Sequence, residues 1–307
     1  MHTSIVVSSI RERRNELMEC IKSLLEQTGS EKYEIIVVCD YDLQLAISSN
    51  NIEIKVIKIN DKGLSHKRNA GIKVAKGEIM AFIDDDAIAD KYWLKNLTKY
   101  YSDKKVGCVG GRIDPIFKDK IPGWLEGNEM CLGGFNYFPE NGKLKKQIIG
   151  ANFSVRKCIF DEIGLFSIYY GRGSGKYEYG EEDNLINQIK EKYTIVFSES
   201  AIVKHIIQKE KITKQYIKSN CYSWGKNSGR FYLEYRKKDH LFIIKNILKT
   251  IVLSGEYIIS RKYIKYCQII FQMGFFALVI GNRFGKRKMD YDEQHTISTN
   301  ENITLYT

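Results

Sequence analysis

Three consecutive aspartates, Asp84, Asp85 and Asp86, follow directly after the short apolar run Ile79–Ile83. Such a run is typical of a buried strand, and open α/β sheets bind their ligands at the carboxyl ends of strands. Asp84 and Asp86 are two positions apart in an extended chain, so one can face a sugar and the other a metal ion. Clustered carboxylates are costly unless donors or a cation compensate them, and a hard divalent ion bridging two phosphates would do so.

Three further polar features accompany the aspartates. The basic segment Lys67–Asn69 lies before an apolar stripe of helical spacing that stops at Gly77. Downstream, Glu181–Asp183 opens an expected helix, where acidic residues suit the N-terminus. His205 follows 22 residues after Asp183, within a strand pattern.

The elements that must position these groups alternate between strand and helix. Strands are expected at 5–8, 34–39 and 52–59, and a helix with one apolar face is expected at 15–25. This order predicts an α/β fold with a doubly wound, Rossmann-like and mostly parallel sheet.

Composition limits the classes of protein. With 307 residues, 43% of them hydrophobic, the chain can bury one large core with an appendage. Its seven cysteines show no C-x-x-C spacing, which argues against a disulfide framework or a structural zinc site and for a reducing compartment. We find no signal peptide at the N-terminus.

The basic residues are concentrated in the last third of the chain. Residues 204–288 hold 19 Lys and Arg against 4 Asp and Glu, a charge of +15 that leaves −4 for the rest of the +11 chain. Residues 241–253 form an amphipathic pattern, and the apolar run 267–281 is shorter than the roughly 20 residues of a spanning helix. We therefore expect association with an anionic membrane surface, and no nucleic acid partner.

These motifs resemble, in order, those of family 2 inverting glycosyltransferases with the GT-A fold, over roughly residues 3–230. The resemblance implies that Asp40 contacts the nucleobase and Asp84 the ribose, although Cys39 and Tyr41 replace the residues usual beside Asp40. The segment around Asn152 resembles the strand that borders the donor sugar. The expected donor-binding set is Ser8, Arg11, Asp40, Lys67, Arg68, Asn69, Asp84, Asp85 and Asn152.

The same resemblance assigns the chemistry. Inverting transfer is one in-line displacement, and Asp183 of the pair Glu182–Asp183 is expected to take the proton of the acceptor hydroxyl. Mn²⁺ or Mg²⁺ on Asp86 and His205 would stabilise the departing diphosphate, and an imidazole ligand favours Mn²⁺. Trp124 and Arg172 are weaker candidates for acceptor contacts.

The implied enzyme moves a sugar from a nucleotide-diphosphate sugar, with uridine the expected base, to a glycan or lipid-linked glycan. It lacks a Q-x-x-R-W motif and a convincing span, so we expect a non-processive enzyme of cell-surface polysaccharide synthesis. Its expected location is cytoplasmic, on the inner face of the cell membrane. The expected domains are a nucleotide-sugar binding and catalytic domain at 1–208, a basic helical region at 209–289 and a disordered tail at 290–307.

Plainer interpretations stand beside these. The aspartates after the strand could form a solvated turn. Glu181–Asp183 could be an ordinary acidic helix start, and His205 could be a structural histidine. Trp124 could simply cover the hydrophobic core, and Arg172 could be a solvated surface side chain. Two other classes of protein remain: a sugar nucleotidyltransferase, and a basic peripheral membrane-binding protein with a degenerate site.

Overall fold

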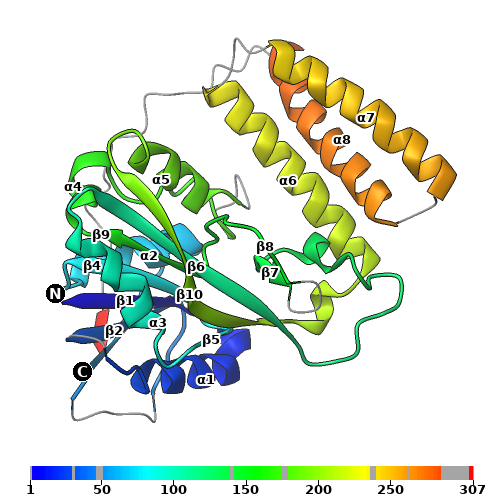
Figure 1. Cartoon of the computed structure of the whole chain (residues 1–307). Helices are drawn as coiled ribbons and strands as arrows, with labels where there is room; N and C mark the ends of the chain where they lie inside the picture. Colours follow the sequence, from blue (N-terminus) through cyan, green and yellow to red (C-terminus); the bar gives the residue numbers. More distant parts are fainter. Residues whose placement is uncertain are drawn as a thin grey trace. The chain divides into compact units, whose positions relative to one another are not determined.

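The computed structural model of the chain describes residues 2–29, 32–45, 51–138, 142–173, 179–235, 240–260, 263–284 and 304–306. Within it the chain forms two compact units (Figure 1). Unit 1 comprises residues 1–116, 134–206 and 297–307, and unit 2 comprises 117–133 and 207–296. The segment 117–133, which the sequence analysis assigned to the first domain, thus belongs to the helical unit.

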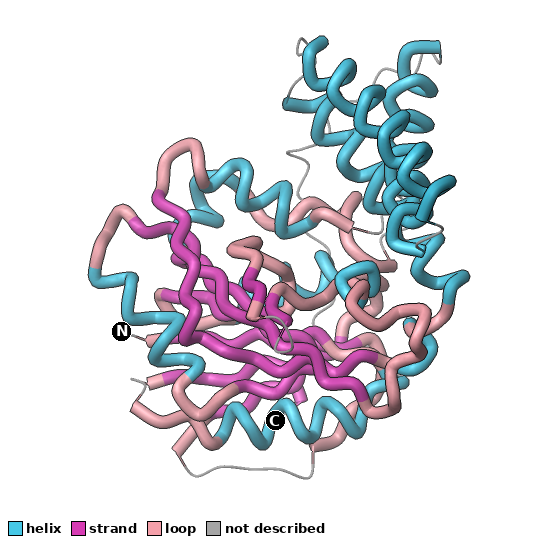
Figure 2. The backbone as a smooth tube through the Cα atoms, turned by 45° about the vertical axis from the view of Figure 1, so that its right-hand side comes forward, coloured by secondary structure: helices cyan, strands magenta, loops and turns pink. Residues whose placement is uncertain are grey.

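Unit 1 is built on one nine-stranded sheet, whose strands lie side by side in Figure 2. The strand order is β11-β3-β2-β1-β4-β9-β6-β10-β5. Its strands are β1 (Thr3–Ser8), β2 (Tyr33–Cys39), β3 (Glu53–Lys58), β4 (Ile79–Asp84), β5 (Ala87–Ala89), β6 (Val106–Phe117), β9 (Asn152–Arg156), β10 (Thr194–Ile207) and β11 (Thr304–Tyr306), while β7 (Tyr137–Phe138) and β8 (Lys143–Leu144) pair separately.

The expected parallel strands form the first half of this sheet. β3, β2, β1 and β4 pair in parallel, and their side chains are buried on both faces along β1, β2 and β4. Burial on both faces explains why these strands are continuous apolar runs in the sequence. Val6 of β1 packs in the core on one face, and Gly71 leaves room for Val6 because a Cβ there would lie 2.6 Å from its Cγ1.

The second half of the sheet is antiparallel, so the sheet is mixed rather than mostly parallel. β9 runs antiparallel to both β4 and β6, and β10 runs antiparallel to β5. β10 is one strand of 14 residues. In the expected disordered tail, β11 pairs antiparallel with β3, and 290–303 lie outside the described residues.

Helices cover the sheet on both faces (Figure 1). Apolar side chains of α2, α4 and α5 join one core with Val6, Ile36 and Phe82 of the strands. Leu17, Ile21 and Leu24 of α1 are fully buried. The helices of unit 1 are α1 (Arg14–Leu25), α2 (Leu64–Val74), α3 (Trp93–Thr98), α4 (Cys158–Ile163) and α5 (Glu181–Ile189), with short 3₁₀ turns at Arg11–Arg13, Lys99–Ser102 and, in unit 2, Glu129–Leu132 and Lys209–Lys211.

Unit 2 is a packed group of three long helices, α6 (Lys214–Tyr235), α7 (His240–Ser260) and α8 (Tyr263–Phe284). Glycines let α6 and α8 approach closely: a Cβ on Gly225 would lie 1.8 Å from the Phe271 carbonyl oxygen, and one on Gly274 would lie 2.1 Å from that of Tyr222. Backbone contact of this kind requires residues without a side chain.

The apolar run expected at 267–281 lies within α8. The stretch Tyr263–Gly281 has the length and composition to cross a membrane. Of its 18-residue apolar segment, 33% is buried inside the structure. Phe275 and Val279 pack in a core with Tyr232 of α6, and Cys267 and Gln272 are also buried. One face of α8 is therefore used for packing within unit 2.

The close approach of α6 and α8 can be tested with a matched pair of substitutions. Gly225→Ala should force the two backbones apart and lower the free energy of unfolding by about 1–3 kcal/mol, the usual cost of overpacking. Gly255→Ala in α7 meets no atom within 4 Å and should be neutral or slightly stabilising. Thermal unfolding followed by circular dichroism compares the two, and equal midpoints for both variants would refute the contact.

Candidate active site at the carboxyl edge of the sheet

Three neighbouring parallel strands end in polar residues at the same edge of the sheet. Ser8 at the end of β1 pairs in register with Asp84 at the end of β4, and Asp40 follows the last residue of β2. Of these side chains, Asp40 is 25% exposed and Asp84 is 28% exposed. Ser8, Asp40 and Asp84, three of the expected donor-binding residues, thus lie at one strand edge.

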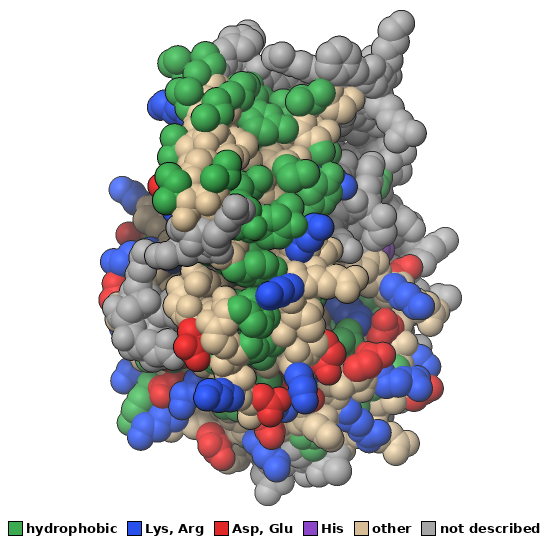
Figure 3. Space-filling view, turned by 90° about the vertical axis from the view of Figure 1, so that its right-hand side faces the viewer, with side chains coloured by type: hydrophobic (Ala, Val, Ile, Leu, Met, Phe, Trp, Pro, Cys, Tyr) green, Lys and Arg blue, Asp and Glu red, His purple; other side chains and the backbone are tan. Residues whose placement is uncertain are grey.

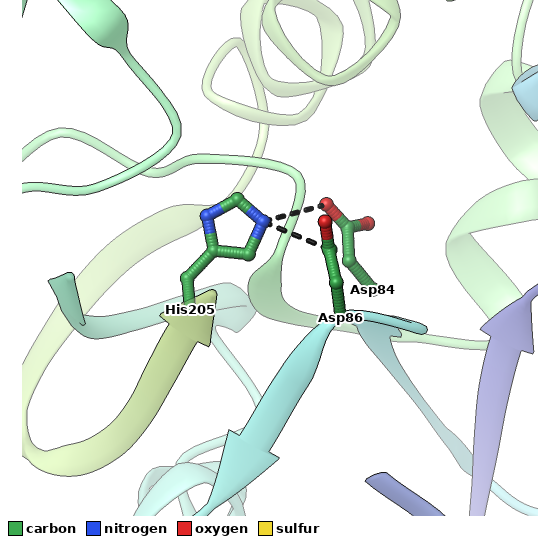
Figure 4. A group of neighbouring side chains, drawn as sticks. All are labelled: Asp84, Asp86 and His205. Atoms are coloured by element: carbon green, nitrogen blue, oxygen red, sulfur yellow. Dashed lines mark hydrogen bonds and ion pairs between the residues drawn. The ribbon is translucent and has the colours of Figure 1, made fainter. Parts of the chain in front are cut away.

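Asp84, Asp86 and His205 form one cluster, drawn in Figure 4. The His205 Nε2 atom lies 2.9 Å from Asp86 Oδ1 and 4.0 Å from Asp84 Oδ2. Pairing of β10 with β5 brings His205 opposite Ala87, next to the aspartates, and the Ile206 amide donates to the Asp86 carbonyl oxygen at 2.8 Å. The long antiparallel β10 thus carries the histidine to carboxylates that lie 119 residues earlier.

The donor set of this cluster fits a divalent metal ion. One ligand atom from each of the three residues lies within 4.8 Å of the other two. Two carboxylates and one imidazole are ligands that suit Mn²⁺ and also accept Mg²⁺. Asp86 and His205 are buried and Asp84 is partly exposed, so the cluster is open on the side of Asp84.

Arg13 contacts the aspartates and was not identified from the sequence. Its Nη1 atom lies 3.0 Å from Asp85 Oδ1 and 2.9 Å from Asp86 Oδ2. Asp85 also accepts a hydrogen bond from the Ile10 amide at 3.0 Å, and burial raises its pKa to about 6 despite Arg13. Asp85, which was expected to bind the donor, is only 1% exposed. Its contacts join the loop after β1 to the three consecutive aspartates.

The basic segment of α2 divides between the strand edge and the core. Lys67 donates to the Ser9 carbonyl oxygen at 2.7 Å and to Asp40 Oδ1 at 3.2 Å, so it lies among the strand ends. Asn69 is buried and forms two hydrogen bonds with the backbone of Phe166. Its amide joins α2 to the chain after α4.

Arg68 is almost fully buried, with 2% of its surface exposed. It donates to Glu181 Oε1 at 3.0 Å and to the Gly150 carbonyl oxygen at 2.9 Å, and its Nη2 lies 3.7 Å from Asp84 Oδ1. A Cβ on Gly150 would lie 2.7 Å from Nη2, so this glycine makes room for the guanidinium. The guanidinium carbon also lies 5.5–5.9 Å from the ring centres of Phe82, Phe153 and Phe166.

Arg68 thereby links the aspartates to the acidic first turn of α5. Gly180, with φ +98°, precedes this turn in the left-handed conformation. Glu182 accepts the Gly150 amide at 3.1 Å. Burial and the charge of Glu182 raise the pKa of Asp183 to about 7, and burial also raises the pKa of Glu181 against the attraction of Arg68.

Asn152 lies at the start of β9 and is fully buried. It accepts the Trp93 indole N–H at 2.8 Å and donates to the carbonyl oxygens of Arg112 and Ala201, both at 2.9 Å. These three bonds use its amide to connect α3, β6 and β10. The contacts described for this side chain are with protein.

The remaining candidates are Arg11, Arg172 and Trp124. Arg11 is exposed, with its guanidinium 5.8 Å from the ring centre of Tyr41. Arg172 lies 5.5 Å from the Tyr179 ring, and residues 174–178 of the adjoining glycine-rich loop lie outside the described residues. Trp124 belongs to unit 2, where it packs edge-on against Tyr263.

Three known proteins similar to this chain are all named as transferases of sugars. The glucosyl-dolichyl phosphate glucuronosyltransferase of Haloferax volcanii is 27% identical over 217 residues, which cover 67% of this chain and 69% of that protein. The glycosyltransferase EpsJ of Bacillus subtilis is 32% identical over 121 residues, 36% of this chain and 35% of that one. A solved mannosyltransferase of Pyrobaculum calidifontis, in complex with GDP-Man and Mn²⁺, shares the fold at a TM-score of 0.60 and 12% identity, over 93% of this chain and 88% of its own.

The family comparison covers the strands and aspartates described above. The profile described as glycosyl transferase family 2 matches residues 4–164, more than half of the chain. Its match begins in β1 and ends just after α4, so it includes the ends of β1, β2 and β4. The chain therefore belongs to glycosyl transferase family 2 and is a glycosyltransferase with a GT-A-like fold.

Proposed function

We propose that the chain is a metal-dependent, inverting and non-processive glycosyltransferase that uses a nucleotide-diphosphate sugar, with uridine as the expected base. The observation that carries this proposal is the cluster of Asp84, Asp86 and His205 at the carboxyl edge of the sheet. The relative from Pyrobaculum calidifontis, solved with GDP-Man and Mn²⁺, supports a nucleotide-sugar and metal site in this fold.

In this proposal the side chains at the strand ends bind the nucleotide. Asp40 would accept from the nucleobase and Asp84 from the ribose, with Ser8 nearby at the end of β1. Lys67 keeps Asp40 in place through their contact at 3.2 Å. The burial of Arg68, Asn69, Asp85 and Asn152 leads us to propose that these four position the site from within the protein.

Asp86 and His205 would hold the metal ion together with Asp84. A bound divalent ion would supply positive charge to the departing diphosphate, which is the chemistry that this leaving group needs. Arg13 fixes Asp86 from the other side and so helps to aim its carboxylate.

Asp183 is the proposed general base. The acceptor hydroxyl must lose a proton as it attacks the anomeric carbon, and a carboxylate within hydrogen-bond reach takes it up. The raised pKa of Asp183 suits this role, because a base with a pKa near the working pH accepts a proton more readily than an ordinary aspartate. Glu182, bonded to the Gly150 amide, orients the turn that carries Asp183.

The proposed acceptor is a glycan or lipid-linked glycan on the inner face of the cell membrane, in the assembly of cell-surface polysaccharide. The name of the Haloferax volcanii relative, a glucosyl-dolichyl phosphate glucuronosyltransferase, supports an acceptor of this kind. Weaker acceptor contacts are proposed for Arg172 and Trp124.

The donor site can be tested by thermal unfolding with UDP, GDP, dTDP or ADP, each with and without Mn²⁺. We expect one nucleotide to stabilise the protein only with the metal, by about 2.7 kcal/mol at 100 times its dissociation constant. Asp86→Asn should remove the metal-dependent part of the shift, whereas Asp161→Asn, at an exposed position of α4, should keep it. A shift that is the same for both variants would exclude Asp86 as a ligand.

The base assignment is tested by Asp183→Asn. Loss of a general base typically costs about 10²–10⁴-fold, so kcat should fall by at least 100-fold while nucleotide binding is retained. Glu191→Gln, a matched change at an exposed position after α5, should keep normal turnover. Near-normal turnover of Asp183→Asn in a sugar-transfer assay would show that another group takes the proton.

The raised pKa of Asp183 predicts two opposite dependences on pH. Activity should rise about tenfold per unit up to about pH 7 and then level, because only the carboxylate accepts a proton. The folded state binds this proton more tightly than the unfolded chain does, so stability falls as pH rises from about 4 towards 7. Asp183→Asn should therefore raise the unfolding temperature at pH 8, by an amount that shrinks towards pH 4.

A further inference from the structure

α7 presents an apolar face that no other part of the described chain covers. Eight aliphatic side chains on this helix remain between 45% and 87% exposed. At about 100° per residue they fall within an arc of roughly 140° around the helix axis. We call this set the α7 face: Leu241, Ile244, Ile247, Leu248, Ile251, Val252, Ile258 and Ile259.

The opposite side of α7 already has its packing partners. Phe242 stacks on Tyr232 of α6 with ring centres 5.5 Å apart, and lies 5.9 Å from the ring centre of Phe275 in α8. Leu253 is 6% exposed. The helix thus has one apolar side that packs within unit 2 and a second one that remains exposed.

The α7 face is unusual for the surface of a water-soluble protein. Isolated exposed leucines or isoleucines are ordinary, but soluble monomers rarely expose large contiguous apolar patches unless these bind something. Figure 3 shows hydrophobic side chains gathered over the helices of unit 2, bordered by a few basic ones. The patch therefore indicates an interaction surface.

Charge favours an anionic lipid surface as the partner. Lys245 and Lys249 are exposed at one border of the α7 face, and the only acidic residue of α7 is Glu256. Residues 204–288 carry 19 Lys and Arg against 4 Asp and Glu. Like charge opposes pairing with a second copy of this basic region, whereas anionic head groups attract it.

We propose that the α7 face docks the protein on an anionic bilayer, with α7 lying in the plane of the interface. The eight aliphatic side chains would enter the boundary between head groups and acyl chains, while Lys245 and Lys249 remain among the head groups. This inference rests on the membrane association proposed above and is independent of the donor and acceptor chemistry.

The test is co-sedimentation of the whole chain with phosphatidylcholine vesicles, with and without about a third phosphatidylglycerol. The protein should bind the anionic vesicles, and more weakly as salt rises. The double variant Leu248→Glu and Ile251→Glu should lower the affinity at least tenfold. Ile168→Glu, which changes an aliphatic residue of unit 1 that is 44% exposed, should bind as the unchanged protein does.

A second measurement reports insertion directly. Leu248→Trp should give an emission spectrum that moves to shorter wavelength with anionic vesicles, beyond any change of the unsubstituted protein. Unchanged vesicle binding by the double glutamate variant would overturn the proposal. So would a concentration-dependent dimer that this variant dissociates while vesicle binding persists, because the α7 face would then serve a second copy.

The result of the vesicle-binding test can be distinguished from the result of the donor-site test. Neither Leu248 nor Ile251 lies among the proposed donor or metal ligands, so both variants should keep the stabilisation by nucleoside diphosphate and Mn²⁺. Loss of vesicle binding with this stabilisation intact supports the α7 face. Absence of vesicle binding by the unsubstituted protein would overturn the α7 proposal and leave the donor site standing.

Discussion

The buried guanidinium of Arg68 is the constraint on which the geometry of the site depends. A cation that is 2% exposed must have its charge and donors satisfied inside the protein, because water does not reach it. Glu181 supplies the charge and the Gly150 carbonyl oxygen a second acceptor, while three phenylalanine rings surround the remaining faces. These partners come from separate segments, so one buried charge fixes the turn that bears Asp183 relative to the strand that ends in Asp84.

The consecutive aspartates tolerate one another because basic side chains or hydrogen-bond donors lie beside each of them. Asp84 faces Arg68 and solvent, Asp85 is held by Arg13 and a backbone amide, and Asp86 lies between Arg13 and His205. Removing Arg13 would leave the buried carboxylates of Asp85 and Asp86 without their arginine partner, which is far more costly than losing a surface ion pair. The need to compensate three adjacent carboxylates thus determines which side chains lie around Asp84, Asp85 and Asp86.

Local patterns in the sequence were sufficient for part of this site. The apolar runs of β1, β2 and β4 predicted parallel strands, and the rule that ligands gather at strand ends placed the aspartates. They were insufficient for Arg13, which lies in a run with Arg11 and Arg14, because only the fold decides which arginine points inward. Asn152 shows a similar limit, since a buried amide that joins one helix and two strands has the same sequence signature as one that contacts a sugar.

The helices of unit 2 illustrate why composition alone misplaces an interaction surface. Among the helices that the structure describes, α8 alone has the length and composition of a membrane span. One side of it is nevertheless occupied by α6, across backbone contacts that Gly225 and Gly274 permit. α7 contains Lys245 and Lys249 and is not picked out as a span by the same criteria, but the eight aliphatic residues of the α7 face remain exposed. The apolar content of a helix gives the apolar surface for which burial is favourable. The fold determines how much of that surface remains exposed to solvent. An external apolar partner is therefore required more by α7 than by α8.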